Sequence, residues 1–214
     1  KIQYAMKSGT TTCKITVRFT KEAVVYLRSL DGDTEVAGSL SVSNVDTGTH
    51  IFSLSPDAES ASTGGDEQVD AVWGRYNFHT HPQKAYDNHE VTNGWPSSQD
   101  FWGFVSLQHH TIFHTVSTIE GLYTIAYSKK WLTSGKTVPM WWVMKNLDVP
   151  HQADIPYAEY ATRASAMKYE EIPVFDVTFV PWSNAIGAKI HAYYAPTKGR
   201  CVTTTVDLDM HKRL

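Results

Sequence analysis

Cysteine, charge and long apolar runs are all scarce in this chain of 214 residues. Its two cysteines are too few for a disulfide-rich scaffold or for a zinc site built from thiolates. No apolar stretch approaches the roughly 20 residues that a membrane span needs. The longest, at 138–144, is short and interrupted. We therefore expect no membrane span and no small cysteine-rich fold.

The charge balance is close to neutral, with 22 acidic against 19 basic residues and a net charge of −3. This gives no bulk attraction for nucleic acid or an anionic membrane, so we expect no nucleic-acid partner. Hydrophobic residues make up 42% of the chain, which is typical of a globular protein. The length suits one domain, or one domain with an appendage.

The cysteines and the start of the sequence are the features that relate to the cellular compartment of the protein. Cys13 and Cys201 could pair, but sequence alone does not decide it, and we expect ordinary packed thiols. Lys1 begins no signal-peptide pattern. The sequence does not define the compartment, and an intracellular location is favoured.

Hydrophobic periodicity predicts an α/β protein. Helices are expected where caps precede apolar positions at helical spacing, at 21–30, 97–108 and 156–171. Strands are expected at 12–19, 35–43, 50–54, 69–78, 110–117, 122–128, 174–180, 191–194 and 202–206. Polar or irregular composition predicts an exposed loop at 55–68, a second loop at 82–96 and a tryptophan-rich irregular arm at 131–155.

Ten histidines are an unusual number for this length, and two of them form a pair, His79-Thr-His81. In an extended segment these two side chains point to the same face and can bind one zinc ion. Asp100, at the start of the predicted helix 97–108, is the candidate third ligand. A fourth position left to water is typical of a catalytic zinc site rather than a structural one.

Two further residues have the chemistry that such a site needs. Glu35, on a predicted strand, can accept the proton of the attacking water. Ser97 lies three residues before Asp100 and can donate a hydrogen bond to a tetrahedral oxyanion. Ser98 is a competitor, but we prefer Ser97 because positions i and i+3 share a helix face.

The individual patterns are weak and their combination is stronger. With ten histidines in 214 positions, about 0.5 H-x-H pairs are expected by chance alone. The pattern S-x-x-D is also an ordinary helix-capping pattern. The ordered set is E-x-x-G from Glu35, H-x-H-P from His79 and P-S-x-x-D ending at Asp100. Each piece lies on the kind of element that the chemistry requires.

This ordered set resembles the JAMM motif of the JAB1/MPN/Mov34 metalloenzymes. The resemblance covers residues 13–130 and implies a mixed β-sheet flanked by helices, the cytidine-deaminase-like architecture of MPN domains, with 131–214 as a C-terminal extension that packs on it or binds a partner. It also implies zinc as cofactor. The matching positions would make Glu35 the general base, Ser97 the oxyanion donor, and His79, His81 and Asp100 the metal ligands.

Two features depart from the family's pattern. The segment between His81 and Ser97 has 15 residues, about twice the usual number, and predicts a longer loop that shapes the mouth of the site. The stretch 131–214 is not explained by the motif, and for its Trp141-Trp142 pair we favour packing over a docking surface. His109, His110 and His114 are expected to form no second metal site, because no acidic partner is near. His89 could reach the mouth of the site, but a surface histidine is favoured.

The sequence therefore predicts a zinc-dependent peptidase or isopeptidase, a hydrolase whose substrates are proteins or peptides. Ubiquitin-type conjugates are the family's commonest eukaryotic substrates, and only the resemblance suggests them for this protein. The alternative is a structural subunit of a larger assembly, such as a coat or particle component, with an idle JAMM-type site. Metal content measured together with turnover distinguishes the two.

Overall fold

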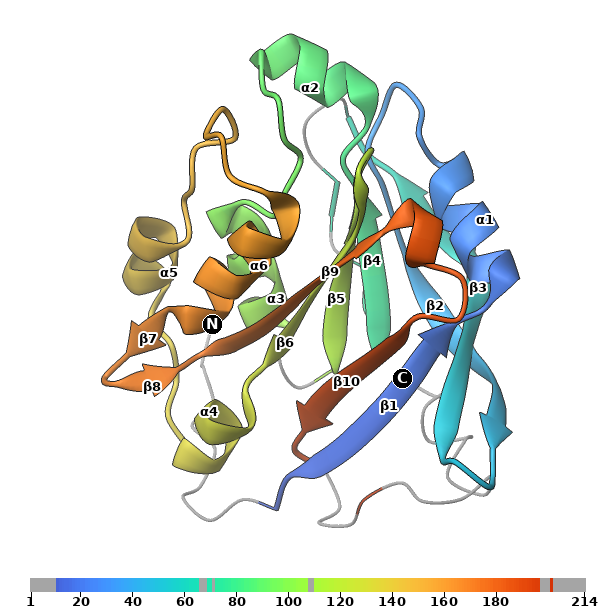
Figure 1. Ribbon diagram of the computed structural model, residues 1–214, viewed down its shortest axis with the longest axis vertical. Helices are drawn as coiled ribbons and strands as arrows, with labels where there is room; N and C mark the ends of the chain where they lie inside the picture. Colours follow the sequence, from blue (N-terminus) through green and yellow to red (C-terminus); the bar gives the residue numbers. More distant parts are fainter. Residues whose placement is uncertain (1–10, 66–68, 71, 108–109, 197–200, 202–214) are drawn as a thin grey trace.

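The computed structural model describes residues 11–65, 69–70, 72–107, 110–196 and 201. These residues form an α/β fold with a mixed eight-stranded sheet in the order β10-β1-β3-β2-β4-β5-β6-β9 (Figure 1). The pairs β1–β3 and β4–β5 are parallel and the other pairs are antiparallel. A separate short hairpin pairs β7 with β8.

The described strands are β1 (Cys13–Phe19), β2 (Val36–Asp46), β3 (Ile51–Thr63), β4 (Tyr76–Thr80), β5 (Phe113–Ser117), β6 (Gly121–Tyr127), β7 (Lys168–Tyr169), β8 (Ile172–Pro173), β9 (Phe175–Pro181) and β10 (Lys189–Tyr194). The helices are α1 (Lys21–Ser29), α2 (Gln83–His89), α3 (Ser98–Ser106), α4 (Lys129–Ser134), α5 (Met140–Asn146) and α6 (Tyr157–Ala166), with one 3₁₀ turn at Trp182–Asn184.

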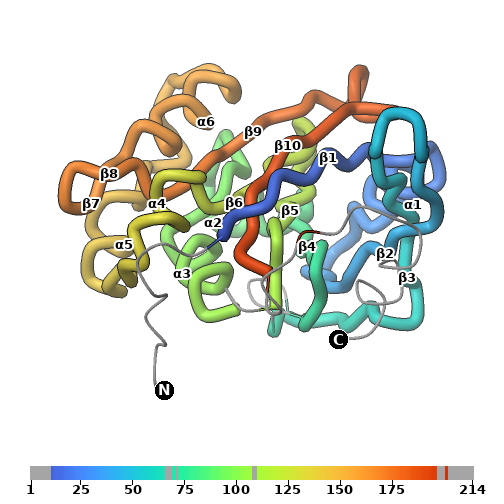
Figure 2. Tube along the Cα trace, turned by 90° about the horizontal axis from the view of Figure 1, so that it is seen from below, coloured from blue at the N-terminus to red at the C-terminus, as the bar shows by residue number. Residues whose placement is uncertain are grey.

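The sheet is curled and nearly closed on itself, because β10 at one edge comes back to contact β6 near the other edge. Its two faces carry separate hydrophobic cores. Strand β6 is buried throughout and alternates between them. Leu122 and Ala126 enter the core on the α1 side, whereas Tyr123, Ile125 and Tyr127 enter the core that α3 to α6 cover. In Figures 1 and 2 these helices lie on the opposite side of the molecule from α1.

Most predicted elements are confirmed with small shifts at their ends. Thr20 caps α1 through its side chain, as expected, and α3 begins directly after Ser97. The predicted strand at 69–78 is confirmed only in its last part, because β4 begins at Tyr76. The strand expected at 202–206 lies outside the described residues.

Three predicted irregular segments prove to be structured. The expected exposed loop at 55–68 is wrong up to Thr63, because β3 continues as a polar strand paired with β2. The loop at 82–96 contains α2, whose Tyr86 is buried. The arm at 131–155 contains α5 and most of α4, which bury Trp131 and Trp142 in the second core. Strand pairing and burial determine the secondary structure of these segments, and neither can be read from local composition.

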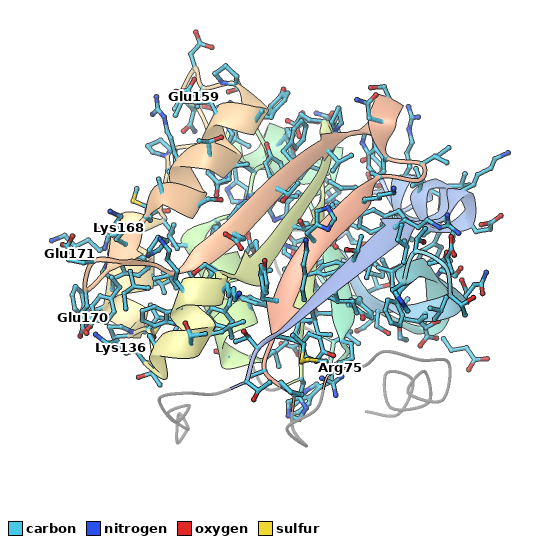
Figure 3. The ribbon with its side chains drawn as sticks, turned by 60° about the horizontal axis from the view of Figure 1, so that its bottom comes forward. Arg75, Lys136, Glu159, Lys168, Glu170 and Glu171 are labelled. Carbon is cyan, nitrogen blue, oxygen red and sulfur yellow. A yellow bond between two sulfur atoms is a disulfide. The ribbon has the colours of Figure 1, made fainter. Side chains whose placement is uncertain are left out.

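Residues beyond 130 contribute to the main sheet at both of its edges. Strand β9 pairs with β6 along seven residues, and β10 pairs with β1. Helix α6 packs against β9. The ion pairs of this half, Lys136–Glu170 and Arg163–Glu159, are exposed, and such pairs contribute little stability. Figure 3 labels Lys136, Glu170 and Glu159.

Cys13 and Cys201 form a disulfide, drawn as a yellow bond in Figure 3. The expectation of two packed free thiols is therefore wrong. The signal was absent from the sequence because 188 positions separate the two residues. Disulfides persist mainly in oxidising compartments, so this bond argues against the intracellular setting that we favoured. Within the described ranges, none of the helices has the length and apolar character needed to cross a membrane.

Reduction of this disulfide should destabilise the protein. Closing so long a loop is worth about 5 kcal/mol in the chain-entropy model. We expect the free energy of unfolding in urea to fall by about 3–5 kcal/mol when a reductant is added. A Cys13→Ala/Cys201→Ala variant should show no such response to the reductant. Two titratable thiols in the oxidised native protein would contradict the assignment.

Candidate metal centre

Strand register places three polar side chains on one face of the sheet. In the parallel pair of β4 and β5, Asn77 lies opposite His114, and His79 follows Asn77 by two residues on the same face. Tyr76 and Phe78 alternate with them and enter the core on the α1 side. His79 therefore stands on the face that α3 covers, where His114 also points.

The second histidine, His81, directly follows the last residue of β4. The His81 backbone N–H continues the ladder by donating to the Ser117 carbonyl at 2.8 Å. In the antiparallel pair of β2 and β4, Ala37 lies opposite His79, and by extension of this register Glu35 faces His81. The backbone of Val36 donates to the Thr80 hydroxyl at 3.0 Å and holds this corner together.

Asp100 reaches the site from the first turn of α3. It forms a capping box with Ser97, in which its Oδ2 accepts from the Ser97 backbone N–H at 2.6 Å and the Ser97 hydroxyl accepts from the Asp100 N–H at 3.3 Å. These bonds fix the carboxylate at the helix end. Oδ1 then faces His79.

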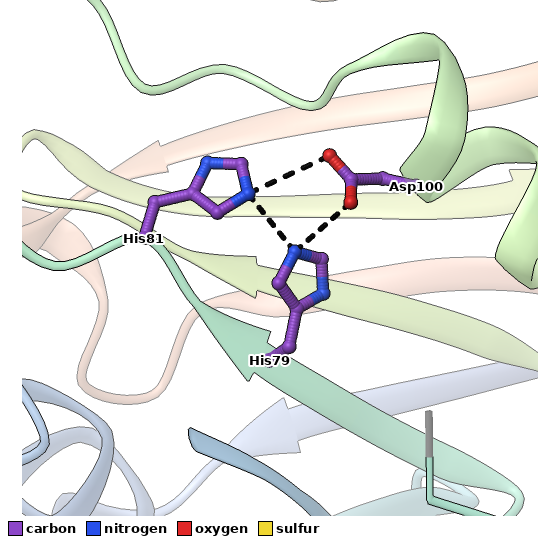
Figure 4. A group of neighbouring side chains, drawn as sticks. All are labelled: His79, His81 and Asp100. Carbon is purple, nitrogen blue, oxygen red and sulfur yellow. Dashed lines mark hydrogen bonds and ion pairs between the residues drawn. The ribbon is translucent and has the colours of Figure 1, made fainter. Parts of the chain in front are cut away.

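The three predicted ligands converge on one point (Figure 4). His79 Nε2 lies 2.9 Å from His81 Nε2 and 3.1 Å from Asp100 Oδ1, and His81 Nε2 lies 3.5 Å from Asp100 Oδ2. Ligands at 2.0–2.1 Å from a tetrahedral zinc ion are about 3.3 Å apart. The side chains are only 10–15% exposed, so the group can bind a metal ion with little competition from solvent.

The tautomer of neutral His79 follows from a chain of hydrogen bonds that ends at a backbone carbonyl. The Val72 carbonyl can only accept, so the Asn77 amide donates to it through Nδ2 at 3.0 Å. Asn77 Oδ1 then accepts from His114 Nδ1–H at 2.8 Å. His114 Nε2 is left as an acceptor for His79 Nδ1–H at 2.7 Å. In neutral His79 the remaining nitrogen, Nε2, therefore presents its lone pair to the site.

The same reasoning applies to His81. Its Nδ1–H donates to the Gly94 carbonyl at 2.7 Å, which leaves Nε2 with a lone pair. Two imidazole lone pairs and one carboxylate therefore face one another, and this arrangement needs a cation between them. Histidine ligands whose other N–H is fixed in this way are typical of metal sites.

The pKa directions agree with this arrangement. Burial opposes ionisation of Asp100, but the adjacent histidines outweigh it and lower the pKa of the carboxyl well below its usual value. Burial likewise opposes the charged form of His81, but Asp100 overrides it and raises the pKa of His81 to about 9. Burial lowers the pKa of His114 to about 3, which keeps it neutral as the hydrogen-bond chain requires. Without a metal, a proton takes the cation's place.

A cavity of about 840 Å³ opens onto these ligands. Glu35 lines it together with His79, His81 and Asp100, and is itself buried. Burial raises the pKa of Glu35, and the nearby histidines oppose that effect. A carboxylate with a raised pKa in such a cavity is suited to exchange protons with a substrate.

Ser97 also lines the cavity, at the N-cap of α3. Its hydroxyl donates to Asp100 Oδ2 at 2.9 Å, so this proton is already used in the capping box. The hydroxyl hydrogen must turn about the Cβ–Oγ bond, away from Asp100, before the hydroxyl can donate to another acceptor. The competitor Ser98 is buried, within the first turn of the helix.

The structure thus brings all five predicted site residues to one cavity, and it adds others that the sequence reasoning missed. The sequence pattern indicated no role for His114, yet His114 contacts His79 directly. Asn77 and Gly94 were also missed. Two-residue alternation with His79 could have indicated Asn77. No local signal connects His81 with a carbonyl 13 residues away.

A scan against protein-family models finds no match, and a search of curated proteins finds none either. The resemblance to JAMM enzymes therefore rests on the sequence motif alone.

Removal of the His114 side chain should weaken metal binding. His114→Ala deletes the acceptor for His79 Nδ1–H, and loss of such a partner costs about 10–100-fold in metal affinity. Competition with a chromophoric chelator measures the zinc dissociation constant. The control is His191→Ala, because His191 is exposed on β10 and bonds only to Thr16 among the contacts described. Equal affinities for the two variants would contradict the role of His114.

Proposed function

We propose that this protein is a zinc-dependent hydrolase that cleaves a peptide or isopeptide bond at the His79, His81 and Asp100 centre. The observation that carries the proposal is the convergence of two imidazole lone pairs and one carboxylate beside a buried glutamate in a single cavity. Three protein ligands with room for a fourth, non-protein ligand are typical of catalytic zinc sites.

Zinc, held by these three side chains, would supply Lewis-acid polarisation of the scissile carbonyl and a lowered pKa for water. Glu35 accepts the proton of the attacking water and delivers it to the leaving amine. Ser97 donates a hydrogen bond to the tetrahedral oxyanion once its hydroxyl hydrogen has turned away from Asp100. His114 and the Gly94 carbonyl keep the two histidine ligands in the required tautomer.

The fold is compatible with the architecture that the motif implies. Helix α1 follows β1 and Glu35 directly precedes β2. His79 lies in β4, His81 directly follows it, and Asp100 lies in the first turn of α3. This order of elements and the mixed sheet support an MPN-type domain. Protein or peptide substrates, including ubiquitin-type conjugates, come from the resemblance, and a cavity of about 840 Å³ can accommodate a short peptide segment.

Glu35→Gln tests the proton-transfer role. Because the amide cannot accept the proton, hydrolysis should fall by about 10²–10⁴-fold, whereas zinc content stays at the wild-type level. Mass spectrometry of peptide-library and isopeptide-linked substrates measures turnover, and elemental analysis measures zinc. Activity retained in Glu35→Gln removes Glu35 from the mechanism. Zinc-loaded wild-type protein without turnover on any amide supports the structural-subunit alternative.

His79→Ala tests the ligand set. It removes one of three protein ligands, so we expect zinc to be lost and hydrolysis to fall to background. His89→Ala is the matched control, because His89 lines the same cavity from α2 without belonging to the ligand cluster. Full zinc occupancy in His79→Ala would contradict the assignment.

A further inference from the structure

We propose that Glu120 and Tyr86 are positioning residues for the metal ligand His81, and that the long segment between His81 and Ser97 is a fixed clamp on that ligand rather than a mobile flap. The inference rests on the metal centre proposed above. It assigns a role to two residues that the motif does not include.

Within the clamp, Gly94 contacts the ligand, because its carbonyl accepts the His81 Nδ1–H bond at 2.7 Å. The position of this carbonyl decides where the His81 ring points and which nitrogen faces the metal. Gly94 lies within the 15 residues that separate His81 from Ser97. The inserted segment therefore supplies a hydrogen-bond partner to the metal ligand itself.

Glu120 holds Gly94 in place from the turn between β5 and β6. Its Oε1 accepts from the Gly94 N–H at 3.3 Å, and its Oε2 accepts from the Tyr86 hydroxyl at 2.7 Å. The turn is itself fixed to the sheet, because Thr118 and Gly121 bond to each other through backbone and side chain. One partly buried carboxylate thus connects the sheet, helix α2 and the residue that holds His81.

Packing between Tyr86 and Gly94 is too close for any other residue at position 94. A Cβ atom on Gly94 would lie 1.6 Å from the Tyr86 hydroxyl oxygen and 2.2 Å from its Cζ. Tyr86 is only 6% exposed, so it has little room to move aside. Helix α2, which lies at the top of Figure 1, is therefore docked through Tyr86 against Gly94 and the turn between β5 and β6.

The far side of the segment is attached as well. The Asn93 backbone N–H donates to the His151 carbonyl at 3.1 Å, and its side-chain amide donates to the same carbonyl and to that of Ala153. Trp95 is fully buried and stacks on Tyr160 of α6. With bonds on both sides of Gly94, the segment has the contacts of a rigid structural element.

The test uses the full chain with Co²⁺ alone as the probe. Glu120→Ala should weaken Co²⁺ binding by about 10–100-fold and change the d–d absorption bands, which report ligand geometry. Tyr86→Phe removes one hydrogen bond and should cost about 2–10-fold. Glu120→Gln can still accept from Gly94 and donate to Tyr86, so it should remain close to wild type. Asp87→Ala is the control, because Asp87 lies on the same helix and bonds only to Gln83 among the side-chain contacts described.

A second measurement does not depend on the metal. In the metal-free protein, exchange of the Gly94 amide hydrogen should be at least about tenfold faster in Glu120→Ala than in Asp87→Ala, because its acceptor is gone. Wild-type Co²⁺ affinity and spectrum in Glu120→Ala would overturn the proposal, as would unchanged Gly94 exchange. If the wild-type protein binds no Co²⁺, the proposed function fails, and the Gly94 exchange alone decides the role of Glu120. If Glu120→Ala does not fold, the Co²⁺ affinity of Tyr86→Phe is compared with that of Glu120→Gln. The proposal predicts weaker binding in Tyr86→Phe, and equal affinities would overturn it.

Discussion

Two backbone carbonyls, those of Val72 and Gly94, set the tautomers of the two histidines in the candidate metal site. Because a carbonyl can only accept, each fixes the direction of the hydrogen bonds that end on it. One chain passes through Asn77 and His114 to His79, and the other reaches His81 directly. Both histidines must then turn a lone pair towards the carboxylate of Asp100, and a cation is required between them.

The rest of the fold keeps these groups in place. Parallel pairing of β4 and β5 sets Asn77 beside His114. The capping box at the start of α3 directs Asp100, and the core beneath α3 anchors the helix through Phe101 and Phe104. Residues from the second half of the chain hold the approach to α3, since the Tyr160 hydroxyl donates to the Pro96 carbonyl at 2.6 Å. The candidate metal site therefore depends on both halves of the sequence.

Sequence patterns predicted those features of the site that depend only on neighbouring residues. Two-residue alternation placed His79 and His81 on one face, and capping chemistry placed Ser97 and Asp100 at a helix start. The missed features depend on contacts between distant residues. His114 reaches His79 only through strand pairing, the polar strand β3 forms only against β2, and the two cysteines meet only when β10 lies beside β1. The burial of Tyr86 that makes α2 part of the structure is likewise set by residues outside the helix.

Anomalous diffraction at the zinc edge, from crystals grown with one equivalent of zinc, tests the central claim most directly. The account predicts one strong peak within about 2.0–2.2 Å of His79 Nε2, His81 Nε2 and an Asp100 carboxylate oxygen. No peak at this position, with the three side chains in the same arrangement and the histidines bridged by a proton, would contradict it.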